Sequence, residues 1–415
     1  MNTTKQHLER GQALILIALA AIGLFGIAGL AIDGSAKFSD RRHAQNAADA
    51  AALAAALARV RGTSETEWKY AAKQRAESNG YDGNFVTNTV LVYDCNEADS
   101  DCGPYAGDSN YVRVVVISHV NTYFARVIGI NQTHNTVESI AMSRAEYKGE
   151  LYGGASIVGL APDQCKTIWF SGSALTDIEG GGVLSNSELD CGLTIQGSTN
   201  LSLDGSIDMV AGGYTKNGNP PLGGILGGIH GNADGYDYPP PAEMLPKITC
   251  AVAASKSGSS MNPGNWSGKF PPSGVTTLKP GTYCIKGDFS LNAKDKLTGT
   301  GVTIFMETGS IQWNGGSEVN LSAPTSGDLA GLLIYSPMSN KNTMQFNGNG
   351  KSMLTGTIFM PAAPLIYNGT GNLNPSHVQI IGYTIELTGT NTTNILYQDT
   401  DNWDSNMPAR VGLFQ

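Results

Sequence analysis

The feature that most constrains this chain is an uninterrupted apolar stretch near its start. Residues 13–32 contain no charged side chain, whereas Arg10 precedes them and Asp33 follows. At about 1.5 Å per residue, a helix of this length matches a bilayer hydrocarbon core of about 30 Å. The stretch therefore predicts a transmembrane anchor over 13–32, preceded by a cytoplasmic stub over 1–12.

Two other interpretations of this stretch stay open. A cleaved signal peptide has an apolar core of about 7–15 residues followed by a small-residue cleavage site. Here the core is longer, and residues 33–38 offer only a weak site of that kind. A buried helix of a soluble domain is normally shorter and carries a polar stripe. We favour an uncleaved, single-pass anchor in contact with membrane lipid.

Six cysteines follow the apolar stretch and indicate the side of the membrane on which the chain lies. An even count without any Cys-x-x-Cys pair favours disulfides over a zinc or dithiol redox site. Disulfides imply export, so we expect most of the chain outside the cytoplasm, in the periplasm or at the cell surface. The alternative is a cytoplasmic protein with free thiols. Neighbours in the sequence favour the pairs Cys95–Cys102, Cys165–Cys191 and Cys250–Cys284, although other connectivities stay open.

The composition fits an exported structural protein. Charged residues make up 15% of the chain, which is below the usual share of about 25%. Gly accounts for 52 of the 415 residues, which is above the usual share of about 7%. The formal net charge is −9. We therefore expect no nucleic-acid partner, because the chain has no basic stripe to neutralise phosphates.

Residues 33–150 predict a small α+β module with a pilin-like outline. No Gly or Pro interrupts 35–61, and alanine has the highest helix propensity, so the apolar helix should continue outward with at most a hinge near Gly34. A second helix is expected over 64–77 and a short one over 123–130. Strands are expected over 84–93, 111–119 and 134–147, where β-branched and aromatic residues gather.

The alanine-rich part of the long helix is the predicted packing surface of this module. Small side chains let another helix or sheet approach closely. The residues expected to make this contact are Ala44, Ala47, Ala48, Ala51 and Ala55. We expect a helix or sheet, from this chain or from a partner protein, to pack here.

Three segments in this region resemble a known family. They are the motif that begins at Glu9 and leads into the apolar helix, the motif Ala-Ile-Asp-Gly over 31–34, and the motif Arg-His-Ala-Gln-Asn-Ala-Ala-Asp over 42–49. Together with residues 120–129 and 137–145, they look like the TadE/TadG-like amino terminus of Flp (tight-adherence) pilus-assembly proteins. The resemblance covers about residues 8–148. It implies a membrane-anchored component whose partners are pilus or pilus-assembly proteins.

One departure separates the chain from pilin subunits of related systems. Those proteins carry a Gly at the cleavage position and a Glu five residues later, whereas here Gly11 is followed at that distance by Leu16. A Glu inside a membrane helix is costly and normally kept for pairing. Its absence implies an uncleaved minor component rather than a major pilin.

Residues 151–415 predict an all-β repeat domain. The segment that starts at Gly172 aligns with the one that starts at Gly197, and Gly-led apolar segments recur at 301, 331, 356 and 382. A period of this size is typical of a solenoid, in which each coil buries its apolar face against its neighbours. We expect a right-handed parallel β-helix. The rival fold, an antiparallel β-sandwich, would show closer hairpin turns without this repeat.

Details of the repeats give further expectations. An aromatic-Asn-Gly motif recurs, so Asn314, Asn347 and Asn368 are predicted to stack at solenoid corners. Residues 212–273 are rich in Gly and Pro and predict an irregular insertion. Residues 399–415 are expected to cap the last coil, because an open solenoid end needs covering.

No catalytic residue, metal site or cofactor is predicted. Asp204 and Asp208 lie four residues apart, but an expected corner between them would aim them differently, whereas glycoside hydrolysis needs clustered carboxylates. The histidines are scattered, and the acidic loops 94–101 and 232–237 have the composition of ordinary turns as well as of calcium loops. We expect a non-enzymatic component of pilus assembly or surface adhesion. The alternative is a surface-anchored β-helix that binds or cleaves a glycan.

Overall fold

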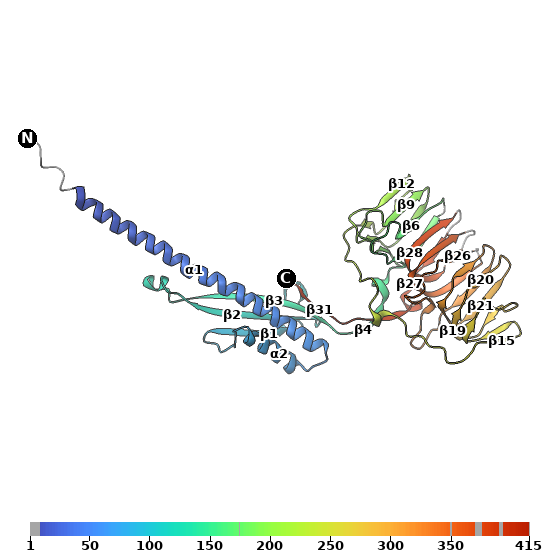
Figure 1. The fold of residues 1–415 in the computed structure, drawn as a ribbon, viewed down its shortest axis with the longest axis horizontal. Helices are drawn as coiled ribbons and strands as arrows, with labels where there is room; N and C mark the ends of the chain where they lie inside the picture. The colour runs from blue at the N-terminus through green and yellow to red at the C-terminus, as the bar shows by residue number, and fades with distance from the viewer. Residues whose placement is uncertain (1–8, 174, 349–350, 370–375, 390–392, 415) are drawn as a thin grey trace, which may run out of the picture. The chain divides into compact units, whose positions relative to one another are not determined.

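The computed structural model describes residues 9–173, 175–348, 351–369, 376–389 and 393–414, which form two compact units (Figure 1). The first unit comprises Met1–Tyr147 and Pro408–Gln415, and the second comprises Lys148–Met407. The sequence predicts a boundary near 150 and assigns everything after it to one domain. In the structure the last segment instead returns to the first unit, so the second unit is an insertion within the first.

The apolar stretch and the alanine-rich stretch form one helix, α1 (Glu9–Val60), of 52 residues. It continues through Gly34 without a break. It is long and apolar enough to cross a membrane by length and composition.

The first unit is a four-stranded antiparallel sheet packed against α1. Its strands, in spatial order, are β1 (Asn88–Asp94), β2 (Tyr111–Asn121), β3 (Gln132–Arg144) and β31 (Arg410–Phe414). A second helix, α2 (Glu65–Ser78), packs on α1. The short helix expected over 123–130 is a 3-10 turn, η2 (Ala125–Ile128), in the loop between β2 and β3. A further 3-10 turn is η1 (Gly103–Tyr105).

The core of the first unit consists of alanines from α1 and valines from the sheet. The five predicted packing alanines are fully buried, and they pack with Trp68 of α2 and with Val112 and Val114 of β2. Alternating residues of β2 face the helix, as expected for a strand with one buried face. This packing surface is therefore covered by the chain's own sheet and second helix.

The second unit is a β-solenoid of stacked parallel strands, as the repeats predict. Its strands pair almost entirely in parallel and in register along three faces, which excludes the antiparallel sandwich. The first face contains β17 (Gly264–Ser267), β19 (Gly281–Lys286), β22 (Val302–Thr308), β25 (Leu332–Tyr335), the middle of β27 (Met353–Gly369), the middle of β28 (His377–Gly389), β5 (Ile157–Gly159), β8 (Val183–Ser185), β11 (Ile207–Met209) and β14 (Ile229–His230).

The other two faces complete each coil. The second contains β20 (Phe289–Leu291), β23 (Ile311–Trp313), β26 (Met344–Gly348), the ends of β27 and β28, β6 (Ile168–Phe170), β9 (Leu193–Gly197) and β12 (Thr215–Gly218). The third contains β16 (Ser260–Asn262), β18 (Thr277–Leu278), β21 (Lys296–Thr300), β24 (Glu318–Ser322), the start of β27, β29 (Thr393–Leu396), β7 (Leu175–Glu179), β10 (Asn200–Leu203) and β13 (Gly224–Ile225).

Smaller elements complete the second unit. They are β15 (Ser255–Ser257), which is antiparallel to β16, the pair β4 (Tyr147–Glu150) and β30 (Asp404–Met407), and the 3-10 turns η3 (Leu151–Gly154), η4 (Ala242–Met244) and η5 (Asp399–Asp401).

The coils do not follow one another in chain order along the solenoid. The first coil stacks on the last, because Ile157 of β5 pairs with Ile380 of β28 and Ile168 of β6 pairs with Ile385. The chain thus enters in the middle and builds coils outward to β14. It then crosses to β15 at the opposite end and returns coil by coil (Figure 1).

This order corrects two expectations. The irregular insertion is shorter than 212–273, because 215–230 and 255–267 supply coil strands and only 231–254 forms the crossover. Residues 399–415 do not cap an open end. The coil that contains β28 is covered by β5 and β6, so the solenoid has no open end there. The segment after this coil instead supplies β31, which pairs with β3 in the sheet of the first unit.

Aromatic rings from successive coils contact one another in the solenoid interior along the second face. Trp313 pairs in register with Phe346, and Phe346 with Tyr367, so the predicted aromatic-Asn-Gly repeat is confirmed. The ring centroids lie 5.0 Å and 5.8 Å apart. Gly382, by contrast, does not occupy the position that the repeat predicts. Gly382 pairs with Met360, not with Gly356, because this coil is shorter than its neighbours.

Corner glycines allow neighbouring coils to approach each other. Gly197 has a φ of +83°, and a Cβ atom built on it would lie 2.7 Å from the carbonyl oxygen of Gly172. Only Gly fits such a position. The repeat that begins with these two glycines therefore has a steric cause.

We predict that Ala51→Phe destabilises the first unit by about 1–3 kcal/mol or more, because overpacking a fully buried position forces side chains and backbone apart. The measurement is the free energy of opening of β2 and β3, from hydrogen exchange of their amides in the full-length protein. Ala54→Phe, at a half-buried position of the same helix, is the matched control. Equal destabilisation by the two variants would contradict the proposed packing.

Candidate membrane-proximal site and solenoid groove

The first half of α1 exposes its apolar side chains on all sides. The large ones between Leu14 and Ile32 are between 48% and 77% exposed. A helix that is apolar all round is stable in a membrane or a core, not in water. This half of α1 therefore fits a single-pass membrane anchor.

Asp33 holds the β2–β3 loop against the end of this apolar half. One of its carboxylate oxygens accepts the backbone N–H of Tyr123 at 2.8 Å, and the other accepts those of Phe124 at 2.9 Å and Ala125 at 2.7 Å. These hydrogen bonds hold the pKa of the Asp33 carboxyl below its ordinary value, and the bond from Ala125 has the largest effect. One carboxylate thus ties helix and loop together.

Phe124 packs on Gly29, one helical turn before Asp33. A Cβ atom built on Gly29 would lie 2.7 Å from the Cβ and Cγ of Phe124, so the ring occupies the space that a side chain at 29 would need. Gly29 is buried, whereas Gly23 and Gly26 of the same helix have nothing within 4 Å of such a Cβ.

A second carboxylate, Asp40, ties the helix to the sheet two turns further on. It accepts hydrogen bonds from the Nδ2 of Asn135 at 2.7 Å, from the hydroxyl of Tyr81 at 3.1 Å and from the hydroxyl of Ser118. Burial, and next the charge of Asp40, raise the pKa of Tyr81. Tyr81 therefore stays a neutral donor.

The sequence patterns do not indicate the contacts of Asp33, Asp40 and Gly29. In the sequence, Asp33 is only a charge that flanks the apolar stretch. The available signal was a carboxylate directly after such a stretch, with a Gly one turn earlier.

The cysteines form three disulfides, Cys95–Cys102, Cys165–Cys191 and Cys250–Cys284, which are the pairs favoured by neighbourhood in the sequence. The first closes the loop after β1. The second links the first two coils, and the third fastens the end of the crossover to β19. All six cysteines of the chain are paired.

The predicted corner asparagines lie on successive coils. Asn347 pairs in register with Asn368, and Asn314 directly follows Trp313, which pairs with Phe346. The Oδ1 of Asn347 accepts a hydrogen bond from the Nε2 of Gln345 at 3.3 Å. Stacking of the three amides along the axis stays a prediction.

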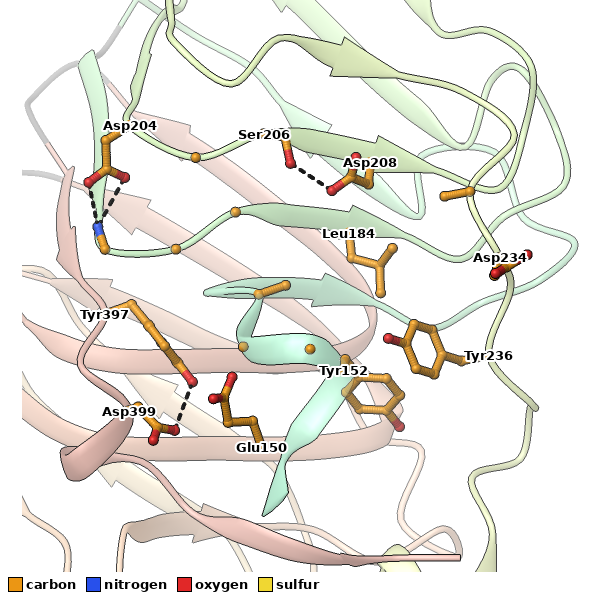
Figure 2. Close-up of a pocket in the computed structure, with 18 residues that line it drawn as sticks. Glu150, Tyr152, Leu184, Asp204, Ser206, Asp208, Asp234, Tyr236, Tyr397 and Asp399 are labelled. Carbon is orange, nitrogen blue, oxygen red and sulfur yellow. Dashed lines mark hydrogen bonds between the residues drawn. The ribbon is translucent and has the colours of Figure 1, made fainter. Parts of the chain in front are cut away.

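The second unit has a groove of about 840 Å³ beside the chain's entry and exit (Figure 2). Tyr152, Tyr236 and Tyr397 line it, and glycines form much of its floor. Its carboxylates are those of Glu150, Asp204, Asp208, Asp234 and Asp399. Among the described lining residues none is Lys, Arg or His. Burial raises the pKa of Glu150, and the negative charges of Asp399 and Asp404 raise it further.

Several of these carboxylates already have protein partners. Both oxygens of Asp204 accept the backbone N–H of Gly180, at 2.8 Å and 3.0 Å, and Asp208 accepts a hydrogen bond from the hydroxyl of Ser206 at 2.7 Å (Figure 2). Asp208 also contacts His230 at 3.1 Å. Asp204 and Asp208 thus line one groove but bond to different neighbours. These contacts join neighbouring coils, from Gly180 to Asp204 and from His230 to Asp208.

The acidic loop 94–101 forms ion pairs with basic side chains of the two helices. Asp94 pairs with Arg59 at 2.7 Å, and Glu97 pairs with Lys69 at 2.5 Å. Within the described ranges, no group of three or more His, Cys, Asp or Glu residues is arranged to hold a metal ion.

Comparison with known families finds a match to part of the amino-terminal region. Residues 11–58 match the model of the Tad family, described as "Putative Flp pilus-assembly TadE/G-like". This match confirms the TadE/TadG-like resemblance over those residues. A search of curated proteins finds no match to the chain, and neither does a search of solved structures.

We predict that Asp33→Asn releases the β2–β3 loop from α1, because it removes the charge that three N–H groups share. Hydrogen bonds to a charged acceptor are stronger than those to a neutral one, so exchange of the Tyr123–Ala125 amides should rise about tenfold. Asp49→Asn is the control, because the described hydrogen bond of the Asp49 carboxylate comes from Gln45 of the same helix and not from the loop.

The same clamp has a defined pH dependence. Since the folded pKa of Asp33 is lowered, its stabilisation is complete above the usual carboxyl value of about 4 and is lost as the pH falls through the lowered value. Unchanged amide protection in Asp33→Asn at neutral pH would contradict this role.

Proposed function

We propose that this protein is a non-enzymatic, single-pass component of an Flp-type pilus-assembly system that carries a β-solenoid outside the cytoplasm. The observation that carries the proposal is the match of residues 11–58 to the TadE/G-like family. The matched residues span the exposed apolar half of α1 and the alanines that form the core of the first unit. The family segment thus supplies both anchor and module core.

The disulfides support the orientation. One lies in the first unit and two in the solenoid, and disulfides persist in oxidising compartments outside the cytoplasm. With one anchor, both units lie on the same side of the membrane, and residues 1–12 lie on the other.

The partners we propose are pilus or pilus-assembly proteins. Since the alanine face of α1 is covered within the first unit, they must bind elsewhere on the module or on the solenoid. The solenoid would act as an adhesive tip or as a spacer.

A second candidate function is that of a surface-anchored glycan-binding protein. The groove lined by three tyrosines and five carboxylates is the observation that favours it, since ligand sites are concave and combine aromatic with polar groups. Binding of the intact protein to surface polysaccharides, lost on Tyr397→Ala, would distinguish this function from a purely structural one.

The orientation is tested with single added cysteines, which are the only reactive thiols because the natural six are paired. In intact cells, a membrane-impermeant maleimide should label Thr66→Cys, on the exposed surface of α2. It should label Gln6→Cys, in the stub, only after the membrane is opened. The reverse pattern, or a free natural thiol in the untreated protein, would contradict the proposal.

A further inference from the structure

We propose that the loop between β2 and β3, residues 122–131, is itself a membrane-binding element that inserts into the lipid interface beside α1. This inference rests on the proposed anchor and goes beyond it. It assigns lipid as the ligand of a segment that is distant from the helix in sequence.

The loop exposes apolar side chains at its tip. Val127 is 90% exposed, Tyr123 73% and Ile128 69%, and Phe124 and Ile130 are each nearly half exposed. Contiguous apolar surface of this kind marks a protein or membrane contact in a folded protein. No Asp or Glu occurs between 121 and 131 that would oppose entry into lipid.

The position of the loop selects lipid over other occupants. Phe124 packs on Gly29, which lies within the apolar half of α1, and Asp33 binds three consecutive N–H groups of the loop. Gly29 lies about 6 Å nearer the bilayer centre than Asp33, at about 1.5 Å per residue. When α1 spans the membrane, the loop is therefore held at its boundary, where interfacial segments bury apolar side chains about 5–10 Å deep.

The remaining chemistry of the loop suits the same boundary. Tyr123 is an aromatic residue with a polar end, a type that gathers at membrane interfaces. Arg126 is exposed and provides a cation for anionic headgroups. The loop thus combines an apolar tip, an aromatic residue and a cation at the depth set by Asp33.

The experiment measures membrane depth with spin labels. Full-length protein carrying Val127→Cys is labelled with a nitroxide and reconstituted into vesicles of phosphatidylethanolamine and phosphatidylglycerol. Accessibility to oxygen, which concentrates in lipid, is compared with accessibility to a water-soluble nickel chelate. Leu24→Cys, in the apolar half of α1, and Thr66→Cys, on α2, are the lipid and water references.

A matched pair of variants tests the cause. Gly29→Leu should expel Phe124 and move the label at 127 toward water, because its side chain needs the space that the ring occupies. Gly26→Leu adds the same side chain where nothing lies within 4 Å and should leave the label in place.

The inference predicts an oxygen-to-nickel accessibility ratio at 127 that approaches the Leu24 reference and exceeds the Thr66 reference several-fold. A ratio at 127 equal to that at 66, with the label at 24 in lipid, would overturn the loop's insertion and leave the anchor standing. A label at 127 shielded from both reagents would indicate a protein occupant and overturn lipid as the ligand. A label at 24 in water would overturn the anchor and, with it, this inference.

Discussion

The structure depends on one uninterrupted helix that serves two different environments. The first half of α1 exposes apolar side chains suited to lipid, whereas the second half buries alanines against the sheet of its own chain. Asp33 and Asp40 lie between the two halves and bind the loop and strands at this end of the sheet. Because α1 continues through this junction, the depth of the anchor also sets the depth of the folded module.

The chain passes between the two units twice, because it enters the second unit at Lys148 and leaves it after Met407. Since the first coil stacks on the last, the entering and leaving segments lie together, and β4 pairs with β30 where the chain passes between units. A solenoid built in chain order would place its two ends far apart. Here the crossover 231–254 avoids that separation, and its side chains, including Met244, cover apolar residues such as Phe359.

Features with a local cause could be predicted from the sequence. The length of the apolar stretch and the alanine run predict α1, and the Gly172 and Gly197 repeat predicts stacked coils because neighbouring backbones touch at these corners. The order of the coils could not be predicted, because parallel pairing of β5 with β28 depends on contacts between residues more than 200 positions apart. Asp33 was likewise missed because its partners, residues 123–125, are distant in sequence.

The most direct test of this account is the intact mass of the protein recovered from its native membrane. If α1 is one helix shared by membrane and module, the mature chain must retain residues 13–32 together with the module. A mass that includes this stretch, in the membrane fraction, is the result that we predict. A mature chain that begins near residues 34–37 would mean that the apolar half is removed as a signal peptide, and would contradict the account.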